Sequence, residues 1–402
     1  MEARWHDPDD EHLQVDLSTS DRLKKFIAGT SVVSGTQYTE RLRAFYTSMH
    51  QPSWTAPATS VDKKSLAGLL TTTKSILSSH SSRLLPTVLD ISPLPILNSD
   101  GPSKSCITAL EFQESLALTG GMDKKLRLFR VGETQSTCET TAYFKDLQIT
   151  SAHFGNGQVY VSGKRPFYYV VDVAGSVVKR VPVVLGFEKA ALERMQISPD
   201  WKTLGFLLSS GHIPFVSTQS HKLLFQLQMN SSCLASTYLS DTEFLTAGEE
   251  GDIYSWDLRM RRCIRRFHDE GNIAVTALAA SERYIVTGST AGVVNVYDRL
   301  GEEFTNEAPV PVKTFGNLTT TVDGLAFNPS GEVLVMWSRW KKAAARLVHM
   351  SSLTVFANWP DVRGSGLSYP FAACFSEDSR YVGLGNDSGQ ALLFKLNHYS
   401  HS

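Results

Sequence analysis

Two basic stretches contain the residue types that could bind nucleic acid. The first holds five arginines: Arg259, Arg261, Arg262, Arg265 and Arg266. The second combines indole rings with cations: Trp337, Arg339, Trp340, Lys341 and Lys342. Guanidinium groups bind phosphates and indole rings stack on unpaired bases, so either stretch could contact RNA or another partner. The alternative is an exposed loop and an outer strand that carry solubilising charge, and both interpretations stay open.

Acidic and histidine residues give no comparable indication of catalysis. The amino-terminal run from His6 to His12 contains ligand-type side chains, but nothing beside it fixes their geometry or excludes water. Asp269 and Glu270 are adjacent, and neighbouring residues of an extended chain point to opposite faces, which makes a poor acid–base pair. The sequence lacks the phosphate-loop, zinc-protease and nucleophile-elbow patterns. We therefore expect no catalytic residue, no cofactor, no metal and no enzyme activity.

Composition and charge describe an ordinary globular chain. The 402 residues are 42% hydrophobic and 20% charged, with a net charge of -1, so the whole chain is not a polycation that coats nucleic acid. Five scattered cysteines form no C-x-x-C pair, which favours a reducing compartment over a disulfide or zinc framework. We expect neither a signal peptide, because the amino terminus is acidic, nor a membrane span.

One pattern recurs from about residue 107 onward: an apolar strand, a turn with glycine, and a second strand that ends in a large apolar residue. The clearest copy is FLTAGEEGDIYSWDL, residues 244–258. Further copies are LALTGGMDKKLRLFRV (116–131), YIVTGSTAGVVNVYD (284–298) and YVGLGNDSGQALLFKL (381–396). Helical periodicity is nearly absent over the same range. The pattern predicts an all-β repeat protein.

The repeat period sets the number of repeats. The positions equivalent to Trp256 are Phe129, Val171, Val216, Tyr297, Val348 and Phe394. Successive spacings are 42, 45, 40, 41, 51 and 46 residues. A four-stranded propeller blade takes about 40–45 residues, so seven anchors predict a seven-bladed WD-repeat β-propeller. Closing such a ring leaves only short exposed edges.

Two details of the repeats stand out. WD repeats place an aspartate six residues before the anchor to tie the blade turn, and here only Asp123 fits, with Glu250 a near match. The propeller is therefore divergent. The longest spacing, 51 residues, coincides with the Trp337–Lys342 stretch, so that blade should carry an extended loop. Two tryptophans in an exposed turn are unfavourable unless they pack or bind something.

The residues before the repeats should close the ring. We interpret Val88 to Ile91, within LLPTVLDISPL (84–94), as the outer strand of the last blade. Residues 84–402 then form the propeller, and residues 1–83 form an extension that is mostly irregular or helical. Residues 55–83 are rich in serine and threonine and are typical of a linker.

The extension contains one expected helix, residues 39–49. Leu42, Phe45, Tyr46 and Met49 recur at the spacing of a single apolar helical stripe. Such a stripe packs on the chain's own propeller or docks a partner protein, and the sequence does not distinguish the two.

Several strings, in order, resemble the U3 small nucleolar RNA-associated protein 18 family. They are PSKSCITALEF (102–112), GGMDKKLRLFRV (120–131), YFKDLQI (143–149), WDLRMRRCIRRFHDEG (256–271), GVVNVYD (292–298), KTFGNLTT (313–320), ARLVHMSSLTVFANWP (345–360) and LGNDSGQALLFKLNHYS (384–400). The segment GTQYTERLRAFYTSMHQPSW (35–54) resembles the part of the family ahead of the propeller. Together these strings cover most of residues 100–402.

The resemblance implies a non-catalytic scaffold in early assembly of the small ribosomal subunit. Family members belong to the UTP-B subcomplex of the small-subunit processome, which consists largely of other propeller proteins. That assembly binds the 5′ external transcribed spacer of pre-rRNA and works with the U3 snoRNP in 18S maturation. The resemblance therefore implies a nuclear, nucleolar protein with neither a membrane nor a small-molecule substrate as partner. The alternative is a generic adaptor, such as a ubiquitin-ligase substrate receptor or a chromatin reader.

The family strings also mark three loops. These are Asp269–Gly271, Asn317–Thr320 and Asn358–Pro360, which we interpret as structural or interface loops. Two features depart from the family: the extension is short, and no basic nuclear-localisation run is evident.

Overall fold

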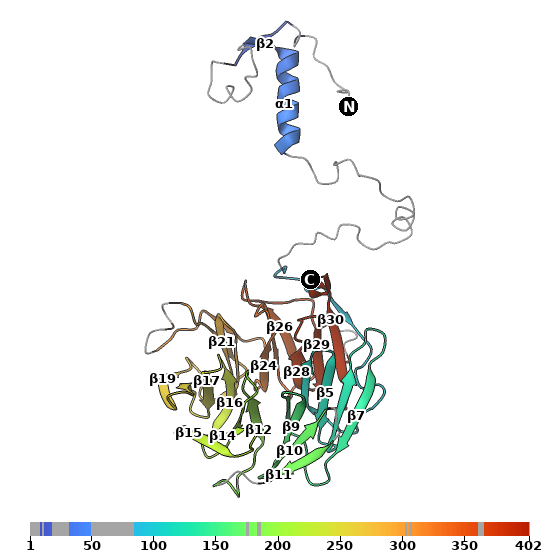
Figure 1. Ribbon diagram of the computed structural model, residues 1–402. Helices are drawn as coiled ribbons and strands as arrows, with labels where there is room; N and C mark the ends of the chain where they lie inside the picture. Colours follow the sequence, from blue (N-terminus) through green and yellow to red (C-terminus); the bar gives the residue numbers. More distant parts are fainter. Residues whose placement is uncertain are drawn as a thin grey trace. The chain divides into compact units, whose positions relative to one another are not determined.

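The repeated strand–turn–strand pattern folds into seven four-stranded antiparallel sheets that form the blades of a ring (Figure 1). This computed structural model confirms the predicted seven-bladed β-propeller. It describes residues 9, 12–17, 32–49, 84–173, 177–182, 186–301, 304, 308–360 and 366–401. The expected linker, residues 55–83, lies outside these ranges.

Each blade runs from an innermost first strand to an outermost fourth strand. Blade 1 is β4 (Ile107–Gln113), β5 (Leu116–Gly121), β6 (Lys125–Arg130) and β7 (Thr137–Tyr143); blade 2 is β8 (Ser151–Phe154), β9 (Gln158–Ser162), β10 (Tyr168–Asp172) and β11 (Val178–Val181). Blade 3 is β12 (Arg194–Ile197), β13 (Thr203–Leu207), β14 (His212–Ser217) and β15 (Leu223–Gln228); blade 4 is β16 (Cys233–Tyr238), β17 (Glu243–Gly248), β18 (Asp252–Asp257) and β19 (Arg262–His268). Blade 5 is β20 (Val275–Ala280), β21 (Tyr284–Ser289), β22 (Val294–Asp298) and β23 (Lys313–Phe315); blade 6 is β24 (Gly324–Phe327), β25 (Val333–Trp337), β26 (Ala345–His349) and β27 (Thr354–Val355). Blade 7 is β28 (Pro370–Phe375), β29 (Tyr381–Asn386), β30 (Ala391–Leu396) and β3 (Ile91–Pro93).

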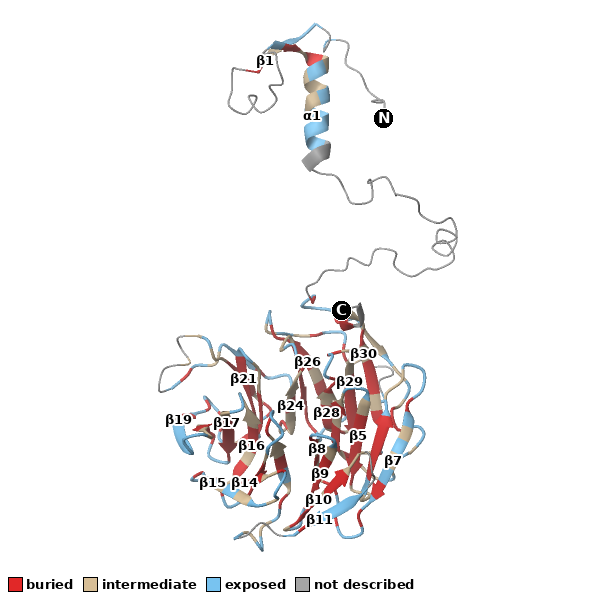
Figure 2. Cartoon of the chain, in the orientation of Figure 1, coloured by how far each residue is buried: buried red, intermediate tan, exposed pale blue. Residues whose placement is uncertain are grey.

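The third strand of each blade carries the anchor of its repeat. All seven anchors are at most 6% exposed: Phe129, Val171, Val216, Trp256, Tyr297, Val348 and Phe394. The core forms between blades, since one cluster joins Val335 of blade 6 to Leu384 of blade 7. Outer strands face solvent instead, and Figure 2 shows β7 and β19 largely in the colour of exposed residues. Stacking of blades therefore buries what a single sheet would leave open.

The ring closes through β3, which pairs antiparallel with the last strand, β30. Ile91 lies opposite Leu396 and Pro93 lies opposite Phe394. The pairing continues past the strand, because the backbone N–H of Leu94 donates to the Leu393 carbonyl over 2.9 Å. Blade 7 is therefore completed by β3, which precedes the first blade in the sequence, and by the last three strands of the chain. Proline is tolerated at position 93 because β3 is an outermost strand.

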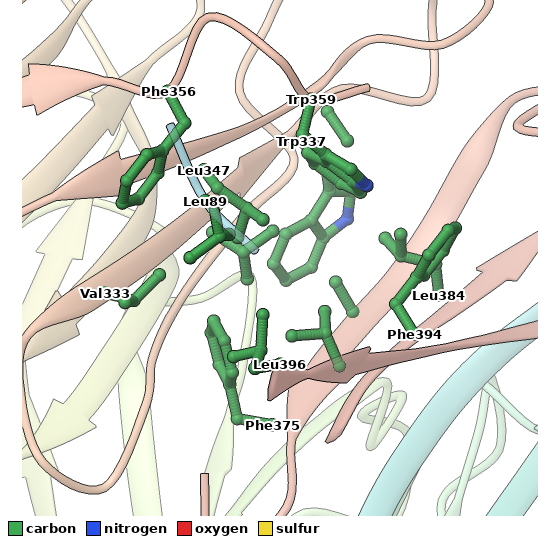
Figure 3. Packing of buried hydrophobic residues seen from close by; sticks show 14 of the residues in the cluster. Leu89, Val333, Trp337, Leu347, Phe356, Trp359, Phe375, Leu384, Phe394 and Leu396 are labelled. Carbon is green, nitrogen blue, oxygen red and sulfur yellow. The ribbon is translucent and has the colours of Figure 1, made fainter. Parts of the chain in front are cut away.

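The closing strand begins at Ile91, three residues later than predicted. Asn358 binds the backbone of Leu89 on both sides: its Oδ1 accepts the Leu89 N–H at 3.0 Å and its Nδ2 donates to the Leu89 carbonyl at 2.7 Å. Leu89 is thereby removed from the β-ladder and its side chain enters the core between blades 6 and 7 (Figure 3). Val88, also expected in the strand, is 58% exposed.

The described residues of the amino-terminal unit, Met1–Ser81, form a two-stranded sheet and one α-helix. Strand β1 (Gln14–Asp16) pairs with β2 (Val32–Ser34), and α1 (Gly35–Met49) follows directly. The helix thus begins four residues before the predicted start, with Ser34, a favoured N-cap type, ahead of it. Leu17 and Val33 are buried within this unit. The small sheet had no counterpart among the sequence predictions.

We expect Leu89→Ala to lower the free energy of unfolding by about 2–5 kcal/mol, because it leaves a cavity in the closure core. Val88→Ala is the matched control, and its exposed side chain should change stability by less than about 0.5 kcal/mol. Urea unfolding followed by tryptophan fluorescence measures both. Equal effects of the two variants would show that the Leu89 contact does not hold the ring closed.

Candidate nucleic-acid interface

The antiparallel blades present two different faces of the ring. In every blade the first and third turns lie at one end, and the second turn and the connection to the next blade lie at the other. The first turns of blades 5, 6 and 7 and the third turn of blade 6 line one shared groove, and the beginnings of all seven innermost strands line the central channel. We call the face of the first and third turns the bottom face, and the opposite one the top face.

Trp337 belongs to the core, which corrects our expectation of two tryptophans in an exposed turn. It ends β25 and is 9% exposed. Its ring lies against Gly324 of β24, where a Cβ atom would collide with the indole. Its Nε1 donates to the Phe371 carbonyl of blade 7 at 3.3 Å. Trp337 therefore joins blades 6 and 7, and burial leaves little of it for RNA or a partner.

Trp340 lies three residues further on, in the β25–β26 turn of the top face, and is 61% exposed. The Arg339 guanidinium carbon lies 5.3 Å from the centre of the indole ring. Arg339 is held in turn by Asp323, whose carboxylate is 3.0 Å from Arg339 Nε and also accepts the Arg339 backbone N–H. Burial raises the pKa of the Asp323 carboxyl, and Arg339 acts in the opposite direction. An anchored arginine thus orients an exposed indole.

Two lysines complete this part of the turn. Lys341 Nζ donates to Thr319 Oγ1 at 3.3 Å, and Lys342 Nζ lies 5.9 Å above the Tyr369 ring. The backbone beneath is fixed, because the Ala343 N–H donates to the Ser368 carbonyl at 2.9 Å. We call Arg339, Trp340, Lys341 and Lys342 the Trp340 platform. Three cations around one exposed indole form a surface that can hold phosphates and stack a base.

The Trp340 platform borders the central channel, since Arg339 also lines that cavity of about 500 Å³. Lys164, Glu193 and Arg194 line it from blades 2 and 3. None of these residues was predicted from the sequence as a contact. Aligning the repeats on their anchors would have placed them on one face, because Glu193 and Arg194 lie at the beginning of an innermost strand and Lys164 lies in a second turn. The channel wall mixes both charge signs, with Glu193 3.8 Å from Lys164.

His153 and Glu111 form a further polar pair at the channel. The His153 Nδ1 and Glu111 Oε1 atoms are 3.5 Å apart. Burial lowers the pKa of His153, but the Glu111 carboxylate and a hydrogen bond to the Met195 backbone together offset this, and the net pKa is raised. Glu111 also accepts the Phe154 backbone N–H at 2.7 Å. This pair therefore links β4 of blade 1 to β8 of blade 2.

The arginine stretch lies on blade 4, separated from the Trp340 platform by blade 5. Arg266 forms an ion pair with Asp252, which raises the pKa of the guanidinium. Arg265 lies 4.6 Å from the centre of the Phe304 ring, and burial lowers its pKa. Arg261 lies 5.0 Å above Phe225 of blade 3. Three arginines of the stretch thus contact residues of blades 3, 4 and 5, while Arg262 is exposed at the start of β19.

The adjacent residues Asp269 and Glu270 differ in burial. Asp269 is fully buried and accepts hydrogen bonds from Tyr297 Oη at 2.5 Å, Thr287 Oγ1 at 2.9 Å and two asparagine amides. Glu270 is exposed. Burial, and then the Asp269 charge, raise the pKa of Tyr297. Asp269 therefore ties the connection after blade 4 to the anchor strand of blade 5. Both of its carboxylate oxygens accept hydrogen bonds from side chains of the fold.

The other two family loops also contribute to packing. Leu318 of the Asn317–Thr320 loop is 4% exposed in the core between blades 5 and 6. Trp359 is 4% exposed and packs edge-on against Phe394, with ring centres 5.8 Å apart (Figure 3). Asn358 holds Leu89 as described above. Within the same loops, Thr319 meets Lys341 of the Trp340 platform.

The expected docking stripe of α1 is exposed within its own unit. Leu42 is 37% exposed, Phe45 is 42% exposed and Tyr46 is 64% exposed. The side chain of Met49 lies outside the described residues. In the described ranges no three histidine, cysteine or carboxylate side chains gather as a metal site. No helix among them is long and apolar enough to cross a membrane.

Comparisons with known proteins give a consistent set of relatives. No family model matches the chain. A protein of Arabidopsis thaliana named U3 small nucleolar RNA-associated protein 18 homolog is 31% identical over 423 residues, covering 100% of this chain and 77% of that protein. The mouse homolog is 34% identical over 75% of this chain and 56% of its own length. The Saccharomyces cerevisiae protein of that name is 28% identical over 99% of this chain and 80% of its own length.

Among solved structures, the chain is similar to the WD40 β-propeller domain of Doa1. The TM-score is 0.62 at 14% identity, with 76% of this chain and 97% of that domain covered. At this identity the likeness concerns the fold alone, and it agrees with the seven-bladed ring.

The two tryptophans should respond differently to truncation. Trp337→Ala removes a buried ring and should lower the free energy of unfolding by about 3–5 kcal/mol. Trp340→Ala loses an exposed ring, its cation–π contact and its side-chain hydrogen bond to Asp323, and should cost about 1 kcal/mol. Chemical denaturation of both variants measures the difference. A large loss for Trp340→Ala would mean that this ring is needed for packing.

Proposed function

Because the chain belongs to the U3 small nucleolar RNA-associated protein 18 family, we propose that it acts with the U3 snoRNP in early small-subunit assembly. The observation that carries this proposal is the similarity of the entire chain to a plant relative of that name. Mammalian and yeast proteins with the same name match 75% and 99% of the chain. The family name also supports a place in the nucleolus.

Within this role, we propose a non-catalytic scaffold of the UTP-B subcomplex that supports 18S maturation. A closed ring with loops on two faces offers separate surfaces to several partners, which supports an assembly role. The buried carboxylate of Asp269 accepts hydrogen bonds from four donors, which supports a structural and not a catalytic role for this residue. Fold alone does not specify the partner, so this step depends on the family.

We further propose that the Trp340 platform contacts unpaired pre-rRNA, including the 5′ external transcribed spacer. An exposed indole flanked by Arg339, Lys341 and Lys342 offers stacking and charge in one turn. Arg262 of blade 4 is a separate candidate contact, because it is exposed while Arg265 packs on Phe304 and Arg266 pairs with Asp252. The exposed stripe of α1 is proposed as a tether to a partner protein of the same subcomplex.

Affinity purification of the tagged chain tests the assembly role. We expect recovery of other propeller proteins of the UTP-B subcomplex together with U3 RNA. Depletion of the protein should reduce 18S rRNA and spare 25S/28S rRNA. Recovery of a cullin adaptor or of chromatin proteins, without pre-rRNA, would contradict the proposal and favour a generic adaptor.

The RNA contact predicts a specific loss of affinity. Trp340→Ala should weaken binding of single-stranded pre-rRNA fragments by roughly 5- to 150-fold, the equivalent of losing one base stack. Replacing Lys341 and Lys342 together by glutamine should lower the slope of log affinity against log salt by about 1.4. Fluorescence anisotropy at several salt concentrations measures both changes.

Trp201→Ala is the control for this experiment, because Trp201 is 40% exposed in the first turn of blade 3, on the bottom face. We expect it to bind RNA as the unaltered protein does. Equal losses of RNA affinity for the two tryptophan variants would contradict RNA binding by this turn. The absence of an ultraviolet crosslink at Arg339, Trp340 or Lys341 would do the same and would mean that the turn is a solvated loop.

A further inference from the structure

A groove of about 870 Å³ crosses the bottom face over three successive blades. It is lined by the first turns of blades 5, 6 and 7 and by the third turn of blade 6. Apolar side chains that are mostly buried form part of its wall: Tyr284, Phe327, Met350 and Phe375. Its volume lies in the range of about 300–1,000 Å³ that is typical of binding clefts.

Carboxylates surround this apolar wall. Glu282, Glu332 and Glu377 line the groove from blades 5, 6 and 7. Glu282 and Glu377 are exposed. Arg283 is the one cation among the described residues of the lining, and its guanidinium lies 3.0 Å from Asp298, so an additional carboxylate balances its charge. The groove is therefore negative, whereas the Trp340 platform on the top face is positive.

The groove is formed before any partner arrives. Asn328 holds its own turn, because its Nδ2 donates to Ser330 Oγ at 2.6 Å and its Oδ1 accepts the Val333 N–H at 2.9 Å. Tyr399 Oη donates to Glu332 at 2.6 Å and fixes that carboxylate. Glu377 accepts the Glu114 N–H of blade 1 at 3.2 Å. A fixed surface loses little conformational entropy when a ligand binds.

We propose that this groove binds a basic peptide segment of a partner protein. Lysine and arginine combine a long apolar stem with a charged end, which matches an apolar wall edged by carboxylates. Arginine also pairs with carboxylates through two parallel hydrogen bonds. RNA does not fit the same charge pattern, because its phosphates would face Glu282, Glu332 and Glu377. The bottom face thus binds a protein segment. This inference does not depend on whether the Trp340 platform binds RNA.

Fluorescence anisotropy with the full chain tests the proposal. The probe is a labelled peptide of the sequence Gly-Arg-Leu-Arg-Leu-Gly, and its counterpart carries glutamate in place of arginine. We expect the basic peptide to bind, with affinity that falls as salt screens the carboxylates, and the acidic peptide not to bind. Replacing Glu282 and Glu377 together by glutamine should weaken binding roughly 3- to 30-fold, since each exposed ion pair contributes little.

The matched control replaces Glu249 and Glu250 by glutamine. These residues are exposed in the second turn of blade 4, on the top face, so the net charge changes equally while the groove does not. We expect unaltered peptide binding. A second variant, Ser351→Lys, places a cation at the groove and should also weaken binding without altering the core, because Ser351 is exposed.

Three results would overturn the proposal. The first is equal affinity of the unaltered protein and the Glu282/Glu377 variant for the basic peptide. The second is equal binding of the acidic peptide. The third is displacement of the basic peptide by oligouridylate in the double Lys341→Gln, Lys342→Gln variant, which would make the bottom face an RNA site. Thermal unfolding of each variant checks that the ring is intact.

Discussion

Ring closure is the constraint on which the other surfaces depend. A four-stranded blade buries its faces only against its neighbours, and in the described part of the chain each pair of adjacent blades shares its own hydrophobic cluster. Blade 7 lacks a fourth strand until β3 pairs with β30. Asn358 and Leu89 then extend that junction into the core of blade 6. The central channel and the bottom groove both cross blades 6 and 7, so both require the closed ring.

The sequence predicted the features that repeat. Seven anchors at regular spacing gave the blade number, and Asp123 does tie its turn, accepting from the Lys125 N–H at 3.2 Å and pairing with Arg127. Some features that depend on contacts between residues far apart in the sequence were not predicted. Trp337 and Trp340 are close in sequence, and contacts with residues far along the chain, among them Phe371 of blade 7, determine that the first is buried. The start of β3 depends likewise on Asn358, 269 residues away from Leu89.

The candidate surfaces owe their difference to the turns from which they are built. The bottom groove consists of tight turns held by their own side chains, as where Ser376 Oγ donates to Asp378 at 2.6 Å and accepts the Tyr381 N–H. The top face is built from second turns and from the connections between blades, which contain the Trp340 platform and the buried Asp269. A single ring therefore separates a positive aromatic surface from a negative groove. Two partners of opposite charge could bind it without competing.

The pairing of β3 with β30 has a consequence for synthesis of the chain. Ser92 and Asn397, which meet beside this junction at 3.2 Å, are 305 residues apart. At a translation rate of about 5–20 residues per second, β3 leaves the ribosome roughly 15–60 seconds before its partner strand exists. During that interval the nascent propeller is an open arc with apolar blade faces at both ends. Chaperones that cover such faces would therefore act on this protein late in translation, up to the final strand.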